Sequence, residues 1–340
     1  MGKKFTIGVL IGNVHTAHPK DLMRGIRAAA SGMDVNVIYF LGTQSVRFNQ
    51  KFALEDFDYQ YNTVYDYAKL AKVDVLIIAY GSLCIFQKNE DKQAFLDKFA
   101  GIPYVLLEDA TDDPRGIYVM VDNFGGMQKC VEHLIIEHHL KHLVYLGGPE
   151  DNQDAIERKA AFLNVMAEHH LPVTPEMMAV GDYSEFVDNL VEQLLKDNPD
   201  AEAIISANDE MTVACYRVCK AHGLRIGKDI LITGFDDVER ARYSNPPLTT
   251  VSQDAYKMGQ IAVEKAVDIC AGRPVESVRL DAELIIRESC GCKVTRRAKE
   301  KADEKTELLH IIDELRLFQH KSWLGPFLIR DLMQEAENEK

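Results

Sequence analysis

Short apolar runs alternate with longer amphipathic stretches along the chain from Phe5 to Cys290. The runs are rich in Val, Ile, Leu and Tyr, and most of them lack alternating polar residues. Strands that are buried on both faces of a parallel sheet have this pattern. The predicted strands are Phe5–Ile11, Val35–Phe40, Val73–Ala79, Tyr104–Leu107, His142–Leu146, Ala203–Ser206 and Ile230–Thr233.

The amphipathic stretches have apolar residues at helical spacing, which predicts helices between the strands. The predicted helices are Pro19–Ala30, Asn62–Ala71, Lys92–Phe99, Phe124–His138, Ala155–His169, Phe186–Leu195, Glu210–His222 and Ala255–Ala271. Repeated strand–helix alternation is typical of a doubly wound α/β fold. Because this pattern is long for a single domain, we expect two lobes.

The composition excludes some classes of function. The 340 residues include 39 Lys and Arg against 53 Asp and Glu, which gives a formal net charge of −14. Binding to phosphate backbones needs clustered positive charge, so we expect no direct nucleic-acid contact by this chain. No apolar run approaches the roughly 20 residues that span a bilayer, and the start of the chain is unlike a signal peptide. Seven cysteines, mostly in apolar or helical settings, are typical of reduced thiols in a cytoplasmic protein.

The segment beyond Cys292 changes character. Residues Arg296 to Glu307 form a charged run, and a helical stripe of apolar residues follows from Leu308 to Phe318. Such a stripe is typical of a docking helix or a short coiled coil. We therefore expect residues 293–340 to be a helical connector to an output domain that this sequence does not contain.

Longer motifs occur in order along the chain. They are Val121-Asp122-Asn123-Phe124-Gly125-Gly126, Val131-Glu132-His133-Leu134-Ile135, Leu146-Gly147-Gly148-Pro149 followed by Arg158 and Phe162, Ser206-Ala207-Asn208-Asp209-Glu210-Met211, Thr233-Gly234-Phe235-Asp236-Asp237 and Asn245-Pro246-Pro247-Leu248-Thr249-Thr250-Val251. With these motifs, residues 5–292 resemble the ligand-binding region of the lac repressor/galactose repressor family. The resemblance implies two Rossmann-like lobes, as in type I periplasmic binding proteins. It predicts an N-terminal lobe of residues 1–138 plus 254–279 and a C-terminal lobe of residues 139–253 plus 280–292, with crossings near 139–141, 253 and 280.

The chain departs from the family in one respect, because family repressors begin with a helix-turn-helix domain and this sequence begins on the first strand. Arg287-Glu288-Ser289-Cys290-Gly291-Cys292 resembles the end of the sensor modules that precede diguanylate cyclase or histidine kinase outputs. That resemblance implies a sensor whose signal passes through the connector. The alternative is a transcriptional regulator of the lac repressor type whose DNA-binding part is missing or supplied by another chain.

Two groups of residues invite a metal interpretation. Cys290-Gly-Cys292 is the one close cysteine pair, but a structural site needs about four ligands and no second pair lies at a zinc-like spacing. The histidines of the second group are His133, His138, His139 and His142. In the family, a helix ends and a strand begins within this segment, which interrupts the i,i+4 spacing of His138 and His142. We expect no metal ion and no cofactor at either group.

The resemblance implies four ligand contacts in the C-terminal lobe. Arg158 would hold ligand oxygens, because a planar guanidinium suits vicinal hydroxyls, a carboxylate or a base edge; the alternative is an ion pair. Asn208 and Asp236 follow predicted strands, where ligands bind in open α/β sheets. For Asn208 the alternative is a helix cap, a role for which Asp209 competes. Tyr183 would be a stacking aromatic, with a core tyrosine as the alternative.

Candidates in the N-terminal lobe are chosen by position alone, since each follows a predicted strand. They are Asn13, His15, Tyr80, Ser82 and Glu108. We expect this set and the C-terminal set to bind a sugar or nucleoside between the lobes, in a non-enzymatic sensor that forms a homodimer. No nucleophile, phosphate-binding glycine loop or acid–base set accompanies these residues.

Overall fold

The computed structural model describes residues 4–14, 16–43, 58–84, 89–111 and 113–293. Residues Met1–Cys292 form one compact unit, which holds every helix and strand described below. The predicted connector from residue 294 onward and the candidate His15 lie outside the described residues. Among the described helices, none is both long and apolar enough to cross a membrane.

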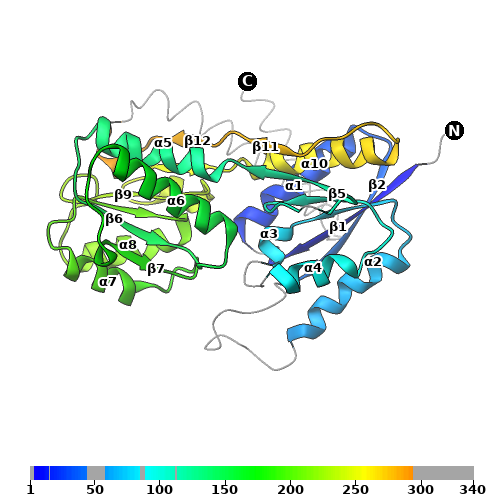
Figure 1. Ribbon diagram of the computed structural model, residues 1–340, viewed down its shortest axis with the longest axis horizontal. Coiled ribbons are helices and arrows are strands. Elements are labelled where there is room, and N and C mark those ends of the chain that lie inside the picture. The colour runs from blue at the N-terminus through cyan, green and yellow to red at the C-terminus, as the bar shows by residue number, and fades with distance from the viewer. Residues whose placement is uncertain (1–3, 15, 44–57, 85–88, 112, 294–340) are drawn as a thin grey trace, which may run out of the picture. The chain divides into compact units, whose positions relative to one another are not determined.

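The first lobe is built on a six-stranded parallel sheet with the order β11-β5-β4-β3-β1-β2. Its strands are β1 (Phe5–Gly12), β2 (Val35–Gly42), β3 (Val75–Ile78), β4 (Tyr104–Leu107), β5 (Gly116–Val121) and β11 (Val278–Leu280). The helices of this lobe are α1 (Ala17–Ser31), α2 (Tyr67–Leu70), α3 (Tyr80–Leu83), α4 (Asn89–Asp97) and α10 (Ala255–Cys270), with a 3-10 helix at Asp58–Asp66. Successive residues of β1 enter two separate apolar cores, because side chains on a strand point to opposite faces. Both faces of the sheet are therefore covered (Figure 1).

The second lobe is built on a four-stranded parallel sheet with the order β7-β6-β8-β9. Its strands are β6 (Leu143–Gly147), β7 (Met178–Val180), β8 (Ala203–Ser206) and β9 (Leu231–Thr233), and single bridges join this sheet to the antiparallel pair β10 (Thr250–Ser252) and β12 (Glu283–Ile285). The helices are α5 (Asn123–Ile136), α6 (Gln153–Glu168), α7 (Asp188–Asp197), α8 (Asp209–Ala221) and α9 (Glu239–Tyr243), with 3-10 helices at Pro175–Met177 and Glu288–Cys290.

All seven predicted strands are present, since each predicted run overlaps a strand of one of the two sheets. The strands that the pattern missed are short or only partly buried, namely β5, β7, β10, β11 and β12. The predicted helix Asn62–Ala71 is instead mostly the 3-10 helix Asp58–Asp66, followed by the single turn of α2.

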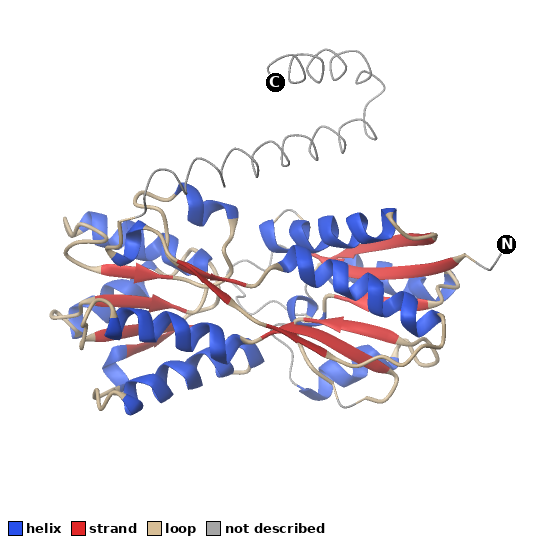
Figure 2. Ribbon diagram, turned by 90° about the horizontal axis from the view of Figure 1, so that it is seen from above, coloured by secondary structure: helices blue, strands red, loops and turns tan. Residues whose placement is uncertain are grey.

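Helix α5 belongs with the second lobe, which corrects the predicted first crossing near 139–141. The helix packs against α6, β10 and β12. It begins at once after β5 because the Asp122 carboxylate accepts a hydrogen bond from the Gly125 amide at 3.0 Å and so caps it. The chain therefore changes lobe at Asp122 rather than after residue 138. The chain also passes between the two sheets at Gln253–Asp254 and after Leu280, and Figure 2 shows these connecting segments. The predicted lobe boundaries at these two places stay a prediction.

Helices α1 and α10 pack so closely that two glycines are required at their contact. A Cβ atom on Gly25 would lie 1.9 Å from the Tyr256 carbonyl oxygen, and one on Gly259 would lie 2.4 Å from the Leu22 carbonyl oxygen. We expect Gly25→Ala to lower the free energy of unfolding by about 1–3 kcal/mol, the usual cost of overpacking a rigid contact. Gly32→Ala is the control, because its Cβ would meet only the Ala29 carbonyl at 3.6 Å. Urea unfolding of both variants checks this, and equal effects would contradict it.

Candidate functional site

Polar side chains follow the carboxyl ends of strands in both sheets, as expected for open α/β folds. In the first lobe they follow β1, β3 and β4, and in the second lobe they follow β8 and β9. These side chains are Asn13, Tyr80, Ser82, Glu108, Asn208 and Asp236. The described candidates thus lie at the sheet edges that the sequence indicated.

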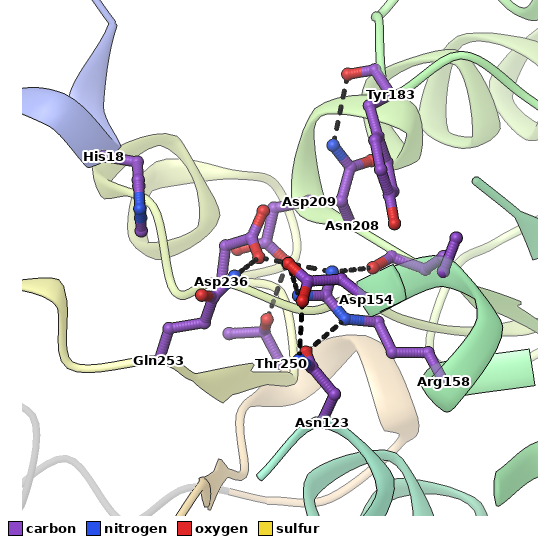
Figure 3. Close-up of polar contacts among 12 residues, drawn as sticks. His18, Asn123, Asp154, Arg158, Tyr183, Asn208, Asp209, Asp236, Thr250 and Gln253 are labelled. Carbon is purple, nitrogen blue, oxygen red and sulfur yellow. Dashed lines mark hydrogen bonds and ion pairs between the residues drawn. The ribbon is translucent and has the colours of Figure 1, made fainter. Parts of the chain in front are cut away.

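Arg158, on α6, is the largest buried charged side chain of this region and is 2% exposed. Its Nε donates to the Asn123 side-chain oxygen at 2.8 Å, and its Nη1 donates to the Ala207 carbonyl at 2.6 Å. The guanidinium carbon lies 3.8 Å from the centre of the Phe235 ring, so the cation also rests on an aromatic face. Figure 3 shows Arg158 pointing from α6 toward Asp154, Asn123 and Asp236. The guanidinium plane is therefore held in one orientation.

Two carboxylates flank Arg158 at distances longer than hydrogen bonds. Asp154 Oδ2 lies 3.6 Å from Nη2, and Asp236 Oδ1 lies 3.6 Å from Nη1. Asn123 donates to Asp154 Oδ1 at 2.8 Å, and Gln253 donates to Asp236 Oδ1. Burial raises the pKa of Asp154 to about 6 although Arg158 opposes the shift, and burial raises the pKa of Asp236 as well. The guanidinium therefore does not fully compensate the two buried carboxyl groups.

Asn208 is the N-cap of α8, and this local role matches the alternative given for it. Its side-chain oxygen accepts from the Met211 amide at 3.0 Å, and its side-chain nitrogen donates to the Tyr183 carbonyl at 3.1 Å. Asp209 is the first residue of the helix rather than its cap. The ring of Tyr183 packs against Gly148, and a Cβ atom on this glycine would lie 2.3 Å from the ring. The Tyr183 hydroxyl donates to the side-chain oxygen of Asn152 at 3.2 Å. Ligand contact by Asn208 and Tyr183 stays a prediction.

Asp209 is a buried carboxyl group that the sequence reasoning treated only as a competing cap. Its Oδ1 accepts from the Thr250 hydroxyl at 2.6 Å, and its Oδ2 accepts from the Val238 amide at 3.0 Å. Burial and the nearby charge of Asp236 raise its pKa well above the usual range. Asp209 thus joins the loop after β9 and strand β10 to the start of α8.

The first lobe contributes an ion pair between Glu108, which was a predicted site residue, and His18, which was not. Glu108, 6% exposed, accepts from the Ser82 amide at 2.6 Å and from the Ser82 hydroxyl, and its other oxygen lies 2.6 Å from His18 Nε2. Burial alone would lower the pKa of His18, but the Glu108 carboxylate outweighs it and raises the pKa to about 9. The pKa of Glu108 is lowered by His18 and Ser82 against the effect of burial. His18 lies on α1 and was missed because its partner is 90 residues away.

The remaining first-lobe candidates have mainly structural contacts. Tyr80 is 4% exposed and packs in the second apolar core, with Lys92 Nζ 6.0 Å from its ring centre. Lys92 is itself buried and forms an ion pair with Asp109 at 2.6 Å. Asn13 has a positive φ of 51°, and its carbonyl accepts from the Thr16 amide at 3.0 Å. Ligand contact by Tyr80 and Asn13 stays a prediction.

Charges on the two lobes affect one another. The charge of Asp236, in the second lobe, contributes to the raised pKa of His18, in the first. The charges of Glu108 and Asp109, in the first lobe, contribute to the raised pKa of Asp154, in the second. Because such effects weaken with distance, the His18–Glu108 pair faces the same region as the Arg158 cluster, which consists of Arg158, Asn123, Asp154 and Asp236 (Figure 3).

A separate group of potential metal ligands lies in the second lobe. Its members are His133, His138, Cys290 and Cys292. Their ligating atoms all lie within 4.8 Å of one another, although the sequence reasoning considered the histidines and the cysteine pair apart and expected no metal at either. The signal in the sequence was a pair of histidines with four residues between them, His133 and His138, together with the distant Cys290-Gly291-Cys292 pair.

Comparisons with known proteins agree with this architecture. Residues 131–290 match the family model of the periplasmic binding protein-like domain. The chain is 30% identical over 216 residues to the HTH-type transcriptional regulator CelR of Thermobifida fusca, covering 61% of this chain and 62% of that protein. It is 29% identical over 198 residues to the repressor PurR of Aliivibrio fischeri strain MJ11, covering 57% and 56%.

Solved structures give the same result for the fold. The CelR–cellobiose complex matches with a TM-score of 0.70 at 23% identity, covering 85% of this chain and 86% of that one. A regulatory protein of the LacI family from Chloroflexus aggregans matches with a TM-score of 0.68 at 25% identity, covering 84% and 98%. The described residues thus form a two-lobed α/β domain of the periplasmic binding protein-like class, which confirms the predicted fold. Similar domains occur in regulators such as CelR and PurR, and the chain spans about three fifths of the length of these two curated relatives.

Proposed function

We propose that this domain senses a small neutral polar ligand, a sugar or nucleoside, bound between the lobes at Arg158. The buried, oriented guanidinium of Arg158 carries this proposal. Two of its nitrogens are already hydrogen-bonded to Asn123 and Ala207, whereas Nη2 has only the 3.6 Å ion pair with Asp154. A guanidinium donor held in this way can bond a ligand oxygen at little entropic cost.

The charge balance around Arg158 favours a neutral ligand with hydroxyl groups over an anionic one. Five carboxyl groups and three cations belong to the two facing clusters. Glu108, Asp109 and Asp209 are buried, Asp154 and Asp236 are half-buried, and the cations are His18, Lys92 and Arg158. Because its raised pKa leaves Asp209 neutral, four carboxylates face three cations. A phosphate or carboxylate on the ligand would add repulsion to this excess, while hydroxyl groups can donate hydrogen bonds to it.

Closure of the lobes would carry the signal. A ligand that contacts both Arg158 and the His18–Glu108 pair stabilises the closed form by the difference between its affinities for the closed and open forms. The ion pair between Arg279 of β11 and Glu157 of α6, at 3.0 Å, is one contact that such a movement would change. We propose that closure acts in a cytoplasmic homodimer on an output domain of the diguanylate cyclase or histidine kinase type.

A second function is favoured by the names of the similar proteins. CelR and PurR are HTH-type regulators, so the same ligand response could control transcription through a DNA-binding part. In that case the part would lie outside this sequence or belong to another chain. Both functions need the same binding step at Arg158, and neither makes the domain an enzyme.

A thermal-shift screen tests the binding step. Protein is unfolded, dialysed and refolded to remove bound ligand, then mixed with neutral sugars, nucleosides and their uronate or phosphate counterparts. At 100 times Kd a ligand adds about 2.7 kcal/mol to the stability of the folded form, which raises Tm by several degrees. We expect this rise with a neutral compound and a smaller one with its anionic counterpart. No rise with any neutral compound would reject the proposal.

A further inference from the structure

Four side chains from two segments of the second lobe that are distant in the sequence converge on one place. His133 lies in the last turn of α5 and His138 just after the helix, whereas Cys290 ends the 3-10 helix Glu288–Cys290 and Cys292 follows it after Gly291. His133 is buried, Cys290 is fully buried, and the other two are half-buried. Both cysteines are free thiols. Two imidazoles and two thiols are thus held together in a largely enclosed place.

The distances among these atoms match the edges of a tetrahedron around one metal ion. His133 Nε2 and His138 Nε2 are 3.3 Å apart, and Cys292 Sγ lies 3.6 Å from the first and 3.4 Å from the second. With usual zinc bond lengths, tetrahedral geometry gives about 3.3 Å between two nitrogens and about 3.6 Å between nitrogen and sulfur. All ligating atoms, that of Cys290 included, lie within 4.8 Å of one another.

The local backbone directs both thiols to the same place. Gly291, between the cysteines, has a positive φ of 85°, which reverses the chain after the 3-10 helix. Ser289 anchors this segment, because its hydroxyl donates to the Ile232 carbonyl at 2.6 Å and accepts from the Thr249 amide at 2.8 Å. A cluster that is held by supporting hydrogen bonds before a metal arrives is what a structural site requires.

We propose that His133, His138, Cys290 and Cys292 bind one structural zinc ion. Two thiolates and two neutral imidazoles form a donor set that selects zinc over magnesium or calcium. Four protein ligands leave no open position for a substrate, so the ion would stabilise the fold rather than catalyse a reaction. The zinc ion would be bound whether or not a ligand binds at Arg158.

The zinc ion would fix one end of α5 to the end of the domain. The other end of α5 starts at Asn123, whose side chain bonds both Arg158 and Asp154. The ion therefore anchors the helix that orients the ligand-binding arginine, and it does so at Cys292, next to the last described residue, Lys293. Removing it should loosen the last turn of α5, whose Val131 and Leu134 pack in the main apolar core.

The test uses the full chain, purified without metal-affinity resin, with zinc measured by elemental analysis and native mass spectrometry. We expect about one zinc ion per wild-type chain. Cys292→Ser and His138→Gln, at half-buried positions, should each lower zinc content at least about tenfold, because a three-ligand site binds the ion far more weakly. The matched controls are Cys270→Ser, a half-buried thiol elsewhere, and His139→Gln, the exposed neighbour. Both controls should keep their zinc.

Cobalt substitution separates a metal site from a merely hydrogen-bonded cluster. Co²⁺ bound by the wild type should give the visible absorption of a tetrahedral ion and a thiolate-to-cobalt charge-transfer band, and Cys292→Ser should lose that band. A zinc chelator should lower the Tm of the wild type and leave that of Cys292→Ser unchanged. Wild-type protein without zinc and without a cobalt spectrum would overturn the proposal, as would thiol titration showing a Cys290–Cys292 disulfide in freshly purified protein.

Discussion

Arg158→Lys is expected to remain folded and to lose at least about 100-fold in affinity for the ligand, which corresponds to roughly 2.7 kcal/mol. Lysine keeps the positive charge between Asp154 and Asp236, so no buried carboxylate loses its counter-ion. It loses the planar fork, which serves Asn123, Ala207 and the ligand at the same time. Calorimetric titration with the best compound from the screen measures the change.

Arg158→Met completes the series by removing the charge as well. Leaving buried charges without a partner is expected to lower the free energy of unfolding by about 3–5 kcal/mol. Arg217→Lys is the control, because Arg217 also pairs with carboxylates but is 43% exposed and lies on α8, away from the cluster. We expect it to change neither stability nor affinity measurably. Unchanged affinity in Arg158→Lys would show that the arginine only supports the fold.

Seven strands of the two sheets could be predicted from the sequence, because most of them are apolar on both faces and need no distant partner to be recognised. The uniformly buried β3, β4, β6 and β8 are examples. The short β7 and β12 could not be predicted, since each has three residues that are only partly buried and carry no pattern of their own. The sequence also did not show to which lobe α5 belongs. This assignment depends on the cap at Asp122 and on the packing of α5 against strands far along the chain.

Site residues could be predicted where they directly follow a strand. They could not be predicted where their role depends on contact with a residue far along the chain. Glu108 and Asp236 were chosen because they follow β4 and β9, and the structure gives both of them buried polar contacts. His18 and Asp209 were missed, since their roles arise from contacts with residues 90 and 41 positions away. The same reason hid the zinc cluster, where Cys292 meets His133 across 159 positions.

The His18–Glu108 pair is expected to make the stability of the protein depend on pH between about 6.5 and 9. The pKa of His18 is raised from 6.5 to about 9 in the folded protein. A raised pKa stabilises the fold fully below pH 6.5, and this contribution disappears as the pH rises through 9. The full shift corresponds to roughly 3 kcal/mol. Since the His18 side chain keeps 22% exposure, we expect about 2 kcal/mol after allowance for solvent screening.

His18→Gln isolates this contribution, because glutamine can still donate to Glu108 but does not titrate. Urea unfolding between pH 6 and 9.5 should show the wild type losing about 2 kcal/mol relative to the variant over this window. Glu108→Gln and the double variant complete a cycle in which the pH-dependent difference should vanish once either partner is changed. Parallel pH curves for wild type and His18→Gln would refute the ion pair.

The same titration reports on contact between the lobes. Because the Asp236 charge helps to raise the pKa of His18, Asp236→Asn should lower that pKa, as followed by the NMR shift of the His18 ring. A ligand that closes the lobes should bring His18 and Asp236 nearer to each other or place hydroxyl groups between them. The pKa of His18 should therefore change when the ligand binds to the wild type. It should change much less when the ligand binds to Asp236→Asn. If neither Asp236→Asn nor the ligand changes the pKa of His18, the His18–Glu108 pair and the Arg158 cluster act separately. Lobe closure would then need another contact to transmit ligand binding.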